Sequence, residues 1–280
     1  MTTAFVLGGG GVLGAVEVGM LRALLERGIR PDLVLGTSVG ALNGAMVARD
    51  PSPAVIERMT ELWEAAADGG DVYGDRPLRT VRRAVSTGTH IYSAKPLVTR
   101  LREEFGEAGF EELEVPLQVC AASIERSAEH WFTEGPIVEA IVASAAVPGL
   151  LPPARVETAY GVEHFLDGGI VNSIPVGRAV ELGADRIFVL QVGRIDRPLA
   201  APRRPWEVAR VSFEVARRHR FIREMSSLPA SVQAHVLPAA GTSSRDDSVL
   251  AYRDFRSVQR RIDATYAASR TWLDEHGIDA

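Results

Sequence analysis

The chain has 280 residues, 46% hydrophobic and 24% charged, a composition typical of a globular protein with one large core. Its formal net charge of −5 argues against nucleic-acid binding, which usually depends on a basic surface. The single cysteine, Cys120, cannot form an internal disulfide, and the apolar run around it predicts a small buried core residue. No Cys/His spacing typical of zinc sites is present.

The N-terminal residues carry no basic side chain and lead directly into an apolar run, which is unlike a signal peptide. No stretch reaches the roughly 18 consecutive apolar residues expected of a transmembrane helix. A cytoplasmic location is therefore the expectation, and peripheral contact with a membrane stays open.

The first fifty residues alternate between short apolar runs and helical periodicity. Residues 4–7 and 33–35 are predicted as buried strands, and residues 12–27 and 41–49 as helices. Strands and helices that alternate with short connections predict a parallel sheet.

The middle of the chain also combines helical and strand patterns. Residues 52–105 have a mainly helical pattern, broken near 68–75 and 86–94. Residues 152–153 and the next few predict a loop or an edge strand, because two prolines stand there. The other expected elements are strands at 116–122, 129–133, 164–166 and 186–192, and helices at 136–145 and 175–182.

The C-terminal part begins with a helix predicted at 203–223 that carries seven arginines. Such a charge run either contacts anionic lipid or forms a solvated helix face, and three interspersed glutamates favour the solvated face. A strand at 234–237, a polar loop at 241–247 and a last helix at 248–276 complete the prediction.

The residues Gly36-Thr37-Ser38-Val39-Gly40 match the pattern Gly-x-Ser-x-Gly between a strand and a helix. A nucleophilic serine at such a turn has a strained backbone, and Gly36 and Gly40 remove side chains that would clash there. The following helix N-terminus would add partial positive charge. The alternative interpretation is that Ser38 only caps the helix.

A run of glycines lies between the first strand and the first helix. The backbone N–H groups of Gly9, Gly10 and Gly11 could form an oxyanion hole. The run up to Gly14 also fits the dinucleotide pattern G-x-G-x-x-G, but the acidic residue needed, Asp32, precedes its strand instead of following it. This placement favours the oxyanion hole over nucleotide binding.

A serine nucleophile needs a base, and none of the six histidines stands where a triad histidine is expected. His164 is close to Asp167 but is predicted to face solvent. Asp167 ends an apolar segment and is followed by Gly168 and Gly169, which predicts a tight turn open to close approach. Asp167 could act as the base of a Ser–Asp dyad, and the alternative is an ordinary Asp-Gly turn.

Together these pieces resemble the bacterial branch of the patatin-like phospholipase family. Four blocks in the family's order carry the resemblance, which covers about residues 3–193. They are residues 6–14 with 19–21, 36–44, 143–153, and 167–176 with 182–185.

The resemblance implies a three-layer α/β/α hydrolase with a mostly parallel central sheet. It implies a single domain over 1–280, in which a helical extension of about 200–280 packs on the motif-bearing part. It implies that the protein is an enzyme, a lipid acyl hydrolase that acts on lipid esters as phospholipase A, lysophospholipase or carboxylesterase, without metal or organic cofactor.

The resemblance also assigns roles to residues. It makes Ser38 the nucleophile and Asp167 the base, and it gives the oxyanion donors as the backbone of Gly9, Gly10 and Gly11. The glycines expected to support these motifs are Gly14, Gly36, Gly40, Gly168 and Gly169.

One position departs from the family pattern. Many members carry a basic residue where this chain has Leu13, and that cation could help to hold a phosphate. Two other functional classes are weighed against the esterase: a nucleotide-dependent α/β protein, and a member of the family that binds lipid without catalysis.

Overall fold

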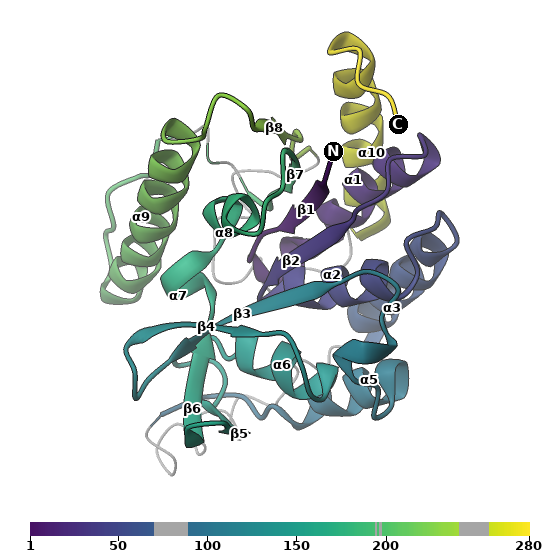
Figure 1. The fold of residues 1–280 in the computed structure, drawn as a ribbon. Helices are drawn as coiled ribbons and strands as arrows, with labels where there is room; N and C mark the ends of the chain where they lie inside the picture. Colours follow the sequence, from purple (N-terminus) through teal and green to yellow (C-terminus); the bar gives the residue numbers. More distant parts are fainter. Residues whose placement is uncertain (70–88, 194, 196–197, 241–257) are drawn as a thin grey trace.

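The computed structural model describes residues 1–69, 89–193, 195, 198–240 and 258–280. Within these residues, strands assemble into one sheet in the order β5-β6-β3-β2-β1-β7-β8, with β4 paired to β3 (Figure 1). The strands are β1 Thr3–Leu7, β2 Leu33–Thr37, β3 Leu117–Ser123, β4 Ala128–Phe132, β5 Ala154–Thr158, β6 Gly161–Asp167, β7 Arg186–Leu190 and β8 Gln233–Val236.

The centre of the sheet is parallel and one side is antiparallel. β3, β2, β1, β7 and β8 run parallel, whereas β4 and β6 pair antiparallel with β3, and β5 pairs antiparallel with β6. The prediction of a mostly parallel sheet is confirmed, and the antiparallel side consists of hairpins with short turns.

Helices cover both faces of the sheet. Figure 1 shows α8 and α9 on one side of the central strands, and α1, α2, α3 and α10 on the other. The helices are α1 Ala15–Glu26, α2 Val39–Arg49, α3 Val55–Gly69, α5 Lys95–Phe105, α6 Ile137–Ser144, α7 Gly169–Asn172, α8 Val176–Glu181, α9 Pro205–Ser226 and α10 Val258–Glu275, with short 3-10 turns at Gly11–Gly14 and Phe110–Glu112.

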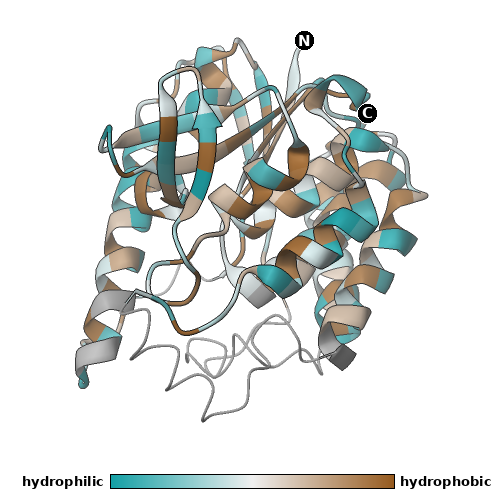
Figure 2. Ribbon diagram, turned by 90° about the horizontal axis from the view of Figure 1, so that it is seen from below, coloured by the Kyte–Doolittle hydropathy of each residue, from teal (hydrophilic) through white to brown (hydrophobic). Residues whose placement is uncertain are grey.

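The side chains of β1 alternate between the two faces of the sheet, and this explains why both faces are covered by helices. Phe5 and Leu7 belong to the core beneath α1 and α2, whereas Ala4 and Val6 belong to the core beneath α8. All four are fully buried. A strand with apolar side chains on both faces is stable only when both faces are covered, which gives the three-layer α/β/α fold. Figure 2 shows the hydrophobic residues concentrated on the strands and on the inner sides of the helices.

Most predicted elements are confirmed, with shifted ends. The helix predicted at 41–49 begins earlier, at Val39, and the helix predicted at 12–27 is divided into a 3-10 turn and α1. The prolines at 152–153 do precede an edge strand, β5. The polar loop predicted at 241–247 and the first ten residues of the helix predicted at 248–276 lie outside the described residues, as do 70–88 of the predicted helical region.

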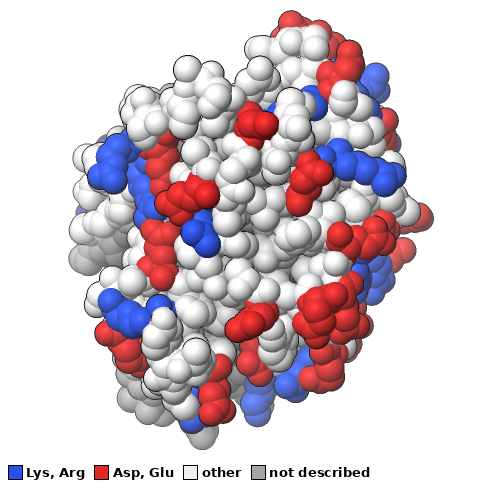
Figure 3. All heavy atoms as spheres, viewed as in Figure 1, with Lys and Arg blue, Asp and Glu red and all other residues white. Residues whose placement is uncertain are grey.

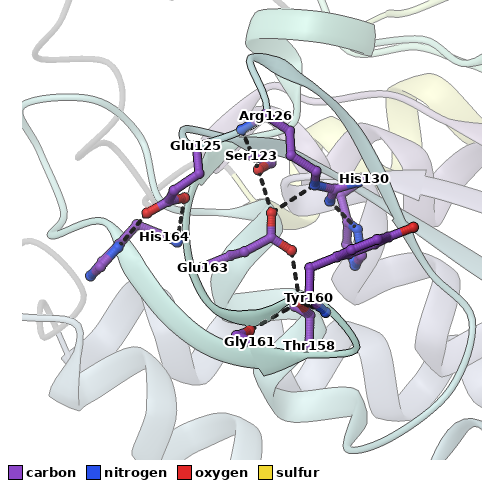
Figure 4. Close-up of polar contacts among 9 residues, drawn as sticks. All are labelled: Ser123, Glu125, Arg126, His130, Thr158, Tyr160, Gly161, Glu163 and His164. Atoms are coloured by element: carbon purple, nitrogen blue, oxygen red, sulfur yellow. Dashed lines mark hydrogen bonds and ion pairs between the residues drawn. The ribbon is translucent and has the colours of Figure 1, made fainter.

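A buried carboxylate fastens the β5–β6 hairpin to β3. Glu163 is 3% exposed and accepts hydrogen bonds from Ser123 (2.8 Å), Arg126 (2.6 Å) and Thr158 (2.7 Å). Figure 4 shows these donors pointing at Glu163 from three sides. Burial alone would raise the pKa of Glu163, but the three hydrogen bonds outweigh it and lower the pKa to about 2.

Candidate active site

Ser38 stands at the turn between β2 and α2 with a strained backbone. Its φ of 56° and ψ of −121° are unusual for a residue with a side chain. A Cβ on Gly36 would lie 2.4 Å from Gly40 O, and a Cβ on Gly40 would lie 2.3 Å from Leu7 O. The glycines at both flanks are therefore required by close packing, as the motif predicts.

The Ser38 side chain does not cap α2, although Ser38 occupies the N-cap position. Its Oγ instead donates a hydrogen bond of 2.6 Å to Asp167 Oδ2. Ser38 is 6% exposed and Asp167 is 3% exposed. The capping alternative is thereby excluded for this side chain, and the two residues singled out from the sequence lie in direct contact.

The sheet register explains how residues 129 positions apart meet. β2 pairs with the first part of β3 and stops at Thr37 opposite Cys120, whereas β6 pairs with the last part and stops at Asp167 opposite Ala121. Because β4 occupies the other side of β3, β2 and β6 approach each other end to end along the same side. Their last residues consequently face each other.

Asp167 is held in the turn by its own neighbours. Its Oδ1 accepts a hydrogen bond of 2.7 Å from the Gly169 N–H, which leaves Oδ2 for Ser38. A Cβ on Gly168 would lie 2.2 Å from Cys120 O, and one on Gly169 would lie 2.7 Å from the Phe213 ring. Gly168 is therefore required by its close packing against the β3 backbone, whereas Gly169 leaves room for the Phe213 ring.

Burial raises the pKa of Asp167 to about 6, although the hydrogen bonds from Ser38 and Gly169 act in the opposite direction. A carboxylate with this pKa is still ionised at neutral pH but accepts a proton more readily than an exposed aspartate. The environment thus suits a carboxylate base.

Ser144 also contacts the Ser38 turn, although its sequence pattern does not single it out. Its Oγ accepts a 2.7 Å hydrogen bond from the Ser38 N–H and donates to Cys120 O at 2.5 Å. Ser144 therefore ties the strained turn to β3. Its signal was present, since it lies within the third block of the family resemblance, but a serine at a helix end has many roles. Cys120 itself is fully buried, as predicted, and burial raises its pKa well above the usual range.

The glycine-rich loop lies directly beside Ser38. A Cβ on Gly9 would lie 3.3 Å from Ser38 Cβ, and Gly11 lines the same pocket as Ser38. The Gly9 N–H, however, donates to Ser173 O at 3.0 Å. This differs from the expectation for Gly9 as an oxyanion donor and leaves Gly10 and Gly11, whose N–H groups have no backbone acceptor among the described residues.

Asn43 on α2 links the end of the glycine-rich loop to α3 by hydrogen bonds. Its Nδ2 donates to Gly14 O (3.0 Å) and to the buried Glu17 (2.7 Å), and its Oδ1 accepts from Trp63 Nε1 at 3.2 Å. Burial raises the pKa of Glu17 well above its usual range, although the Asn43 hydrogen bond lowers it. A Cβ on Gly14 would lie 2.3 Å from Val39 Cγ2, which explains the glycine there.

An apolar pocket of about 140 Å³ opens at Ser38. Its wall comes mainly from α2, α3, α5 and α6, and its aliphatic and aromatic lining is Val39, Leu42, Leu62, Trp63, Ala66, Leu97, Leu101, Ile141, Ala145, Val147 and Leu151. Two charged residues, Arg100 and Glu104, also line it. Such an apolar lining is typical of pockets that bind apolar groups.

The structure argues against the nucleotide-binding alternative. Asp32 lies before β2, at the edge of the sheet opposite Ser38, where its carboxylate accepts a 2.8 Å hydrogen bond from the Thr3 N–H. It therefore cannot reach a ligand at the glycine-rich loop. The His164 side chain is 45% exposed and lies 2.7 Å from Glu125 Oε1, in line with the prediction that it faces solvent. Figure 4 shows His164 directed at Glu125 and away from Glu163.

The prediction that the arginines of α9 form a solvated face is wrong for Arg217. This residue is 6% exposed and donates to Gly9 O (2.8 Å) and Val192 O (3.2 Å). Arg220 is half-buried and donates to Val171 O at 2.6 Å. The sequence pattern cannot separate inward from outward arginines on a helix that faces the sheet with one side only.

Charges on the visible surface are mixed. On the face seen in Figure 1, acidic and basic side chains alternate around a broad uncharged centre (Figure 3). Over the described residues, no three His, Cys, Asp or Glu side chains converge to hold a metal ion. Among the helices in the described ranges, none has the length and apolar character that crossing a bilayer requires.

Fold and site together define a three-layer α/β/α protein with a buried serine at a strained turn between a strand and a helix. The sequence pattern of the family described as "Patatin-like phospholipase" matches residues 5–180. The chain belongs to the patatin-like phospholipase family.

Two curated relatives illustrate the membership. Lysophospholipase nte1 of Aspergillus terreus is 32% identical over 203 residues, which cover 70% of this chain and 12% of the fungal protein. Patatin-like phospholipase domain-containing protein 7 of Rattus norvegicus is 32% identical over 194 residues, which cover 69% of this chain and 14% of the rat protein. The chain therefore spans only a small part of the length of these relatives.

Among solved structures, VipD from Legionella pneumophila is similar at 16% sequence identity and a TM-score of 0.44. The match covers 98% of this chain and 67% of that one.

Proposed function

We propose that this chain hydrolyses carboxylic esters of lipids, with Ser38 as nucleophile and Asp167 as base. The observation that carries the proposal is the 2.6 Å hydrogen bond from Ser38 Oγ to Asp167 Oδ2, at the opening of an apolar pocket. Nucleophile and base are within proton-transfer distance, and the pocket offers a place for an acyl chain beside them.

In the first half of the reaction, Ser38 Oγ attacks the ester carbonyl carbon while its proton passes to Asp167 Oδ2. The carbonyl oxygen becomes an oxyanion, for which the Gly10 and Gly11 N–H groups are the proposed donors. One such donor is typically worth about 3–4 kcal/mol in the transition state. The C–O bond to the alcohol then breaks, and the leaving alcohol takes the proton from Asp167.

In the second half, water attacks the acyl-serine. Asp167 accepts a proton from the water, the tetrahedral intermediate collapses, and the proton returns to Ser38 Oγ as the fatty acid leaves. No other group is required to balance the protons. The raised pKa of Asp167, about 6, supports a base that gains and loses a proton readily near neutral pH.

For the substrate, the name of the fungal relative, lysophospholipase, suggests lysophospholipids as the first class to test. The apolar lining of the pocket agrees with a long acyl chain and offers few polar partners for a headgroup. Peripheral contact with a membrane and a cytoplasmic location stay predictions from the sequence.

The test compares the wild type with Ser38→Ala and Asp167→Asn on lysophosphatidylcholine and on p-nitrophenyl esters. We expect kcat/KM to fall by about 10⁴-fold or more in Ser38→Ala, and by about 10³–10⁴-fold in Asp167→Asn, because the amide cannot accept the proton. Asp32→Asn is the matched control, since it makes the same change at the opposite edge of the sheet.

Near-normal turnover in Asp167→Asn would require a different base. A wild-type protein that binds lipid but cleaves none of these esters would instead support a member of the family without catalysis.

A further inference from the structure

Arg217 is a buried cation that reaches the glycine-rich loop from α9. Its Nη1 donates to Gly9 O at 2.8 Å and its Nη2 to Val192 O at 3.2 Å. Its Nε lies 3.5 Å from Glu214 Oε1, and among the described residues that Nε has no hydrogen-bond partner. With 6% of the residue exposed, the guanidinium has exchanged water for two backbone carbonyls and the nearby Glu214 carboxylate.

Packing stability alone gives little reason for an arginine at this position. Burying a cation costs free energy that two backbone carbonyls and the Glu214 carboxylate, 3.5 Å from Nε, offset only in part, and an apolar side chain of similar volume is often at least as favourable in such a place. A buried ion with such directed hydrogen bonds instead fixes the orientation of the groups it binds. The groups concerned are the carbonyls of Gly9 and Val192.

The Gly9 carbonyl and the Gly10 N–H belong to one planar peptide unit. A donor on the carbonyl oxygen therefore fixes the direction of the N–H on the other side, and it withdraws electron density so that this N–H becomes a stronger donor. Glycines on both sides of this peptide leave its plane free to rotate unless something holds it. Arg217 provides that restraint.

Val192 packs against the same loop. A Cβ on Gly10 would lie 1.7 Å from Val192 Cγ2, so the loop packs directly against the residue whose carbonyl Arg217 also binds. The guanidinium thus joins the loop after β1 to the segment after β7, with Gly10 between them. Rotation of the Gly9–Gly10 peptide would therefore break the hydrogen bond from Arg217 to Gly9 O.

We propose that Arg217 is a positioning residue for ester hydrolysis, which orients and polarises the Gly9–Gly10 peptide so that the Gly10 N–H stabilises the oxyanion. This inference rests on the proposed function. It gives α9, which lies outside the matched family region of residues 5–180, a part in the chemistry at Ser38.

The experiment measures kcat and KM on p-nitrophenyl esters for Arg217→Met and Arg217→Lys. It also measures the inhibition constant of an alkyl trifluoromethyl ketone, which forms a tetrahedral oxyanion on serine. In Arg217→Met we expect kcat to fall by about 10–100-fold with KM changed less than about threefold, since the loss is confined to the transition state. The ketone should lose affinity by a similar factor. Arg217→Lys, which keeps a charged donor, should lie between Arg217→Met and the wild type.

Arg223→Gln is the matched control, because Arg223 is exposed on the same helix. Thermal unfolding of each variant separates positioning from folding. If Arg217→Met is too unstable to assay, the Arg217→Lys variant and its ketone affinity decide the question.

The proposal is overturned if kcat of both variants stays within twofold of the wild type. It is also overturned if KM rises while kcat and ketone affinity are retained. A wild type without esterase activity contradicts the proposed function instead, so the two failures are distinguishable.

Discussion

Asp167 is buried, and within the described part of the chain it accepts hydrogen bonds from two donors, Ser38 Oγ and the Gly169 N–H. Burial therefore dominates and raises its pKa to about 6, while the donors keep the rise limited. A carboxylate in this state is a stronger base than an exposed aspartate, yet remains mostly ionised at pH 7. The raised pKa of Asp167 affects both the pH dependence of turnover and the stability of the fold.

The first consequence concerns the pH dependence of turnover. In the proposed mechanism hydrolysis requires ionised Asp167, so we expect kcat/KM to rise with pH through an apparent pKa of about 6 and to level off above pH 7. The measurement is kcat/KM on a p-nitrophenyl ester between pH 4.5 and 8. An inflection near pH 4 would show that burial does not raise the pKa of the base.

The second consequence concerns stability. Because the folded-state pKa lies above the unfolded value, the folded protein binds the extra proton, and ionised Asp167 lowers stability above pH 6. We expect Asp167→Asn to raise the free energy of unfolding by about 2–3 kcal/mol at pH 7. The gain should shrink as pH falls from 6 to 4. Equal denaturant midpoints for both proteins at pH 7 would contradict this expectation.

At the scale of elements, the β5–β6 hairpin depends on Glu163. Its pKa, lowered to about 2, means that the ionised form stabilises the fold. This stability is present above the unfolded pKa and is lost as pH falls from about 4.5 towards 2. We expect Glu163→Gln to lower the free energy of unfolding by about 1–2 kcal/mol at pH 7, and by less at pH 3.

The measurement is denaturant unfolding of the wild type and of Glu163→Gln at pH 7 and at pH 3. Glu157→Gln, at an exposed position on β5, is the control and should have little effect. A Glu163→Gln variant that unfolds like the wild type at pH 7 would show that the hairpin is held by its strand pairing alone.

Helices α3 and α5 form much of the apolar wall of the pocket, and their side chains set its depth. Ala66 lines the pocket, whereas its neighbour Ala65 is exposed on the same helix. We expect Ala66→Phe to reduce kcat/KM for long acyl chains by about tenfold and to spare short ones, because the ring fills the pocket.

Assays on p-nitrophenyl esters from acetate to palmitate give the chain-length profile. Ala65→Phe serves as the matched control. An unchanged profile in Ala66→Phe would place the acyl chain elsewhere.

At the scale of the whole molecule, the parts of the fold that could be predicted are those fixed by local sequence. The alternation of apolar strands and helices predicted the parallel centre of the sheet, and the glycines around Ser38 and Asp167 predicted the two turns. These signals work because backbone strain and close approach act over a few residues. That residues 1–280 form a single domain stays a prediction.

The parts that could not be predicted depend on contacts between distant segments. Ser144 binds the Ser38 amide across 106 positions, and Arg217 binds Gly9 across 208. Neither residue differs in its local pattern from an ordinary helical serine or arginine. The hydrogen bond from the Gly9 N–H to Ser173 O could not be predicted from the sequence either, since it depends on how the chain folds back after α7.

In the proposed reaction Ser38 becomes covalently acylated with Asp167 as its base. Intact and peptide mass spectrometry after reaction with an alkyl fluorophosphonate tests both roles. We expect one adduct, on the peptide that contains Ser38, no adduct in Ser38→Ala, and strongly slowed labelling in Asp167→Asn. An adduct on another residue, or labelling of Asp167→Asn at the wild-type rate, would contradict the proposed reaction.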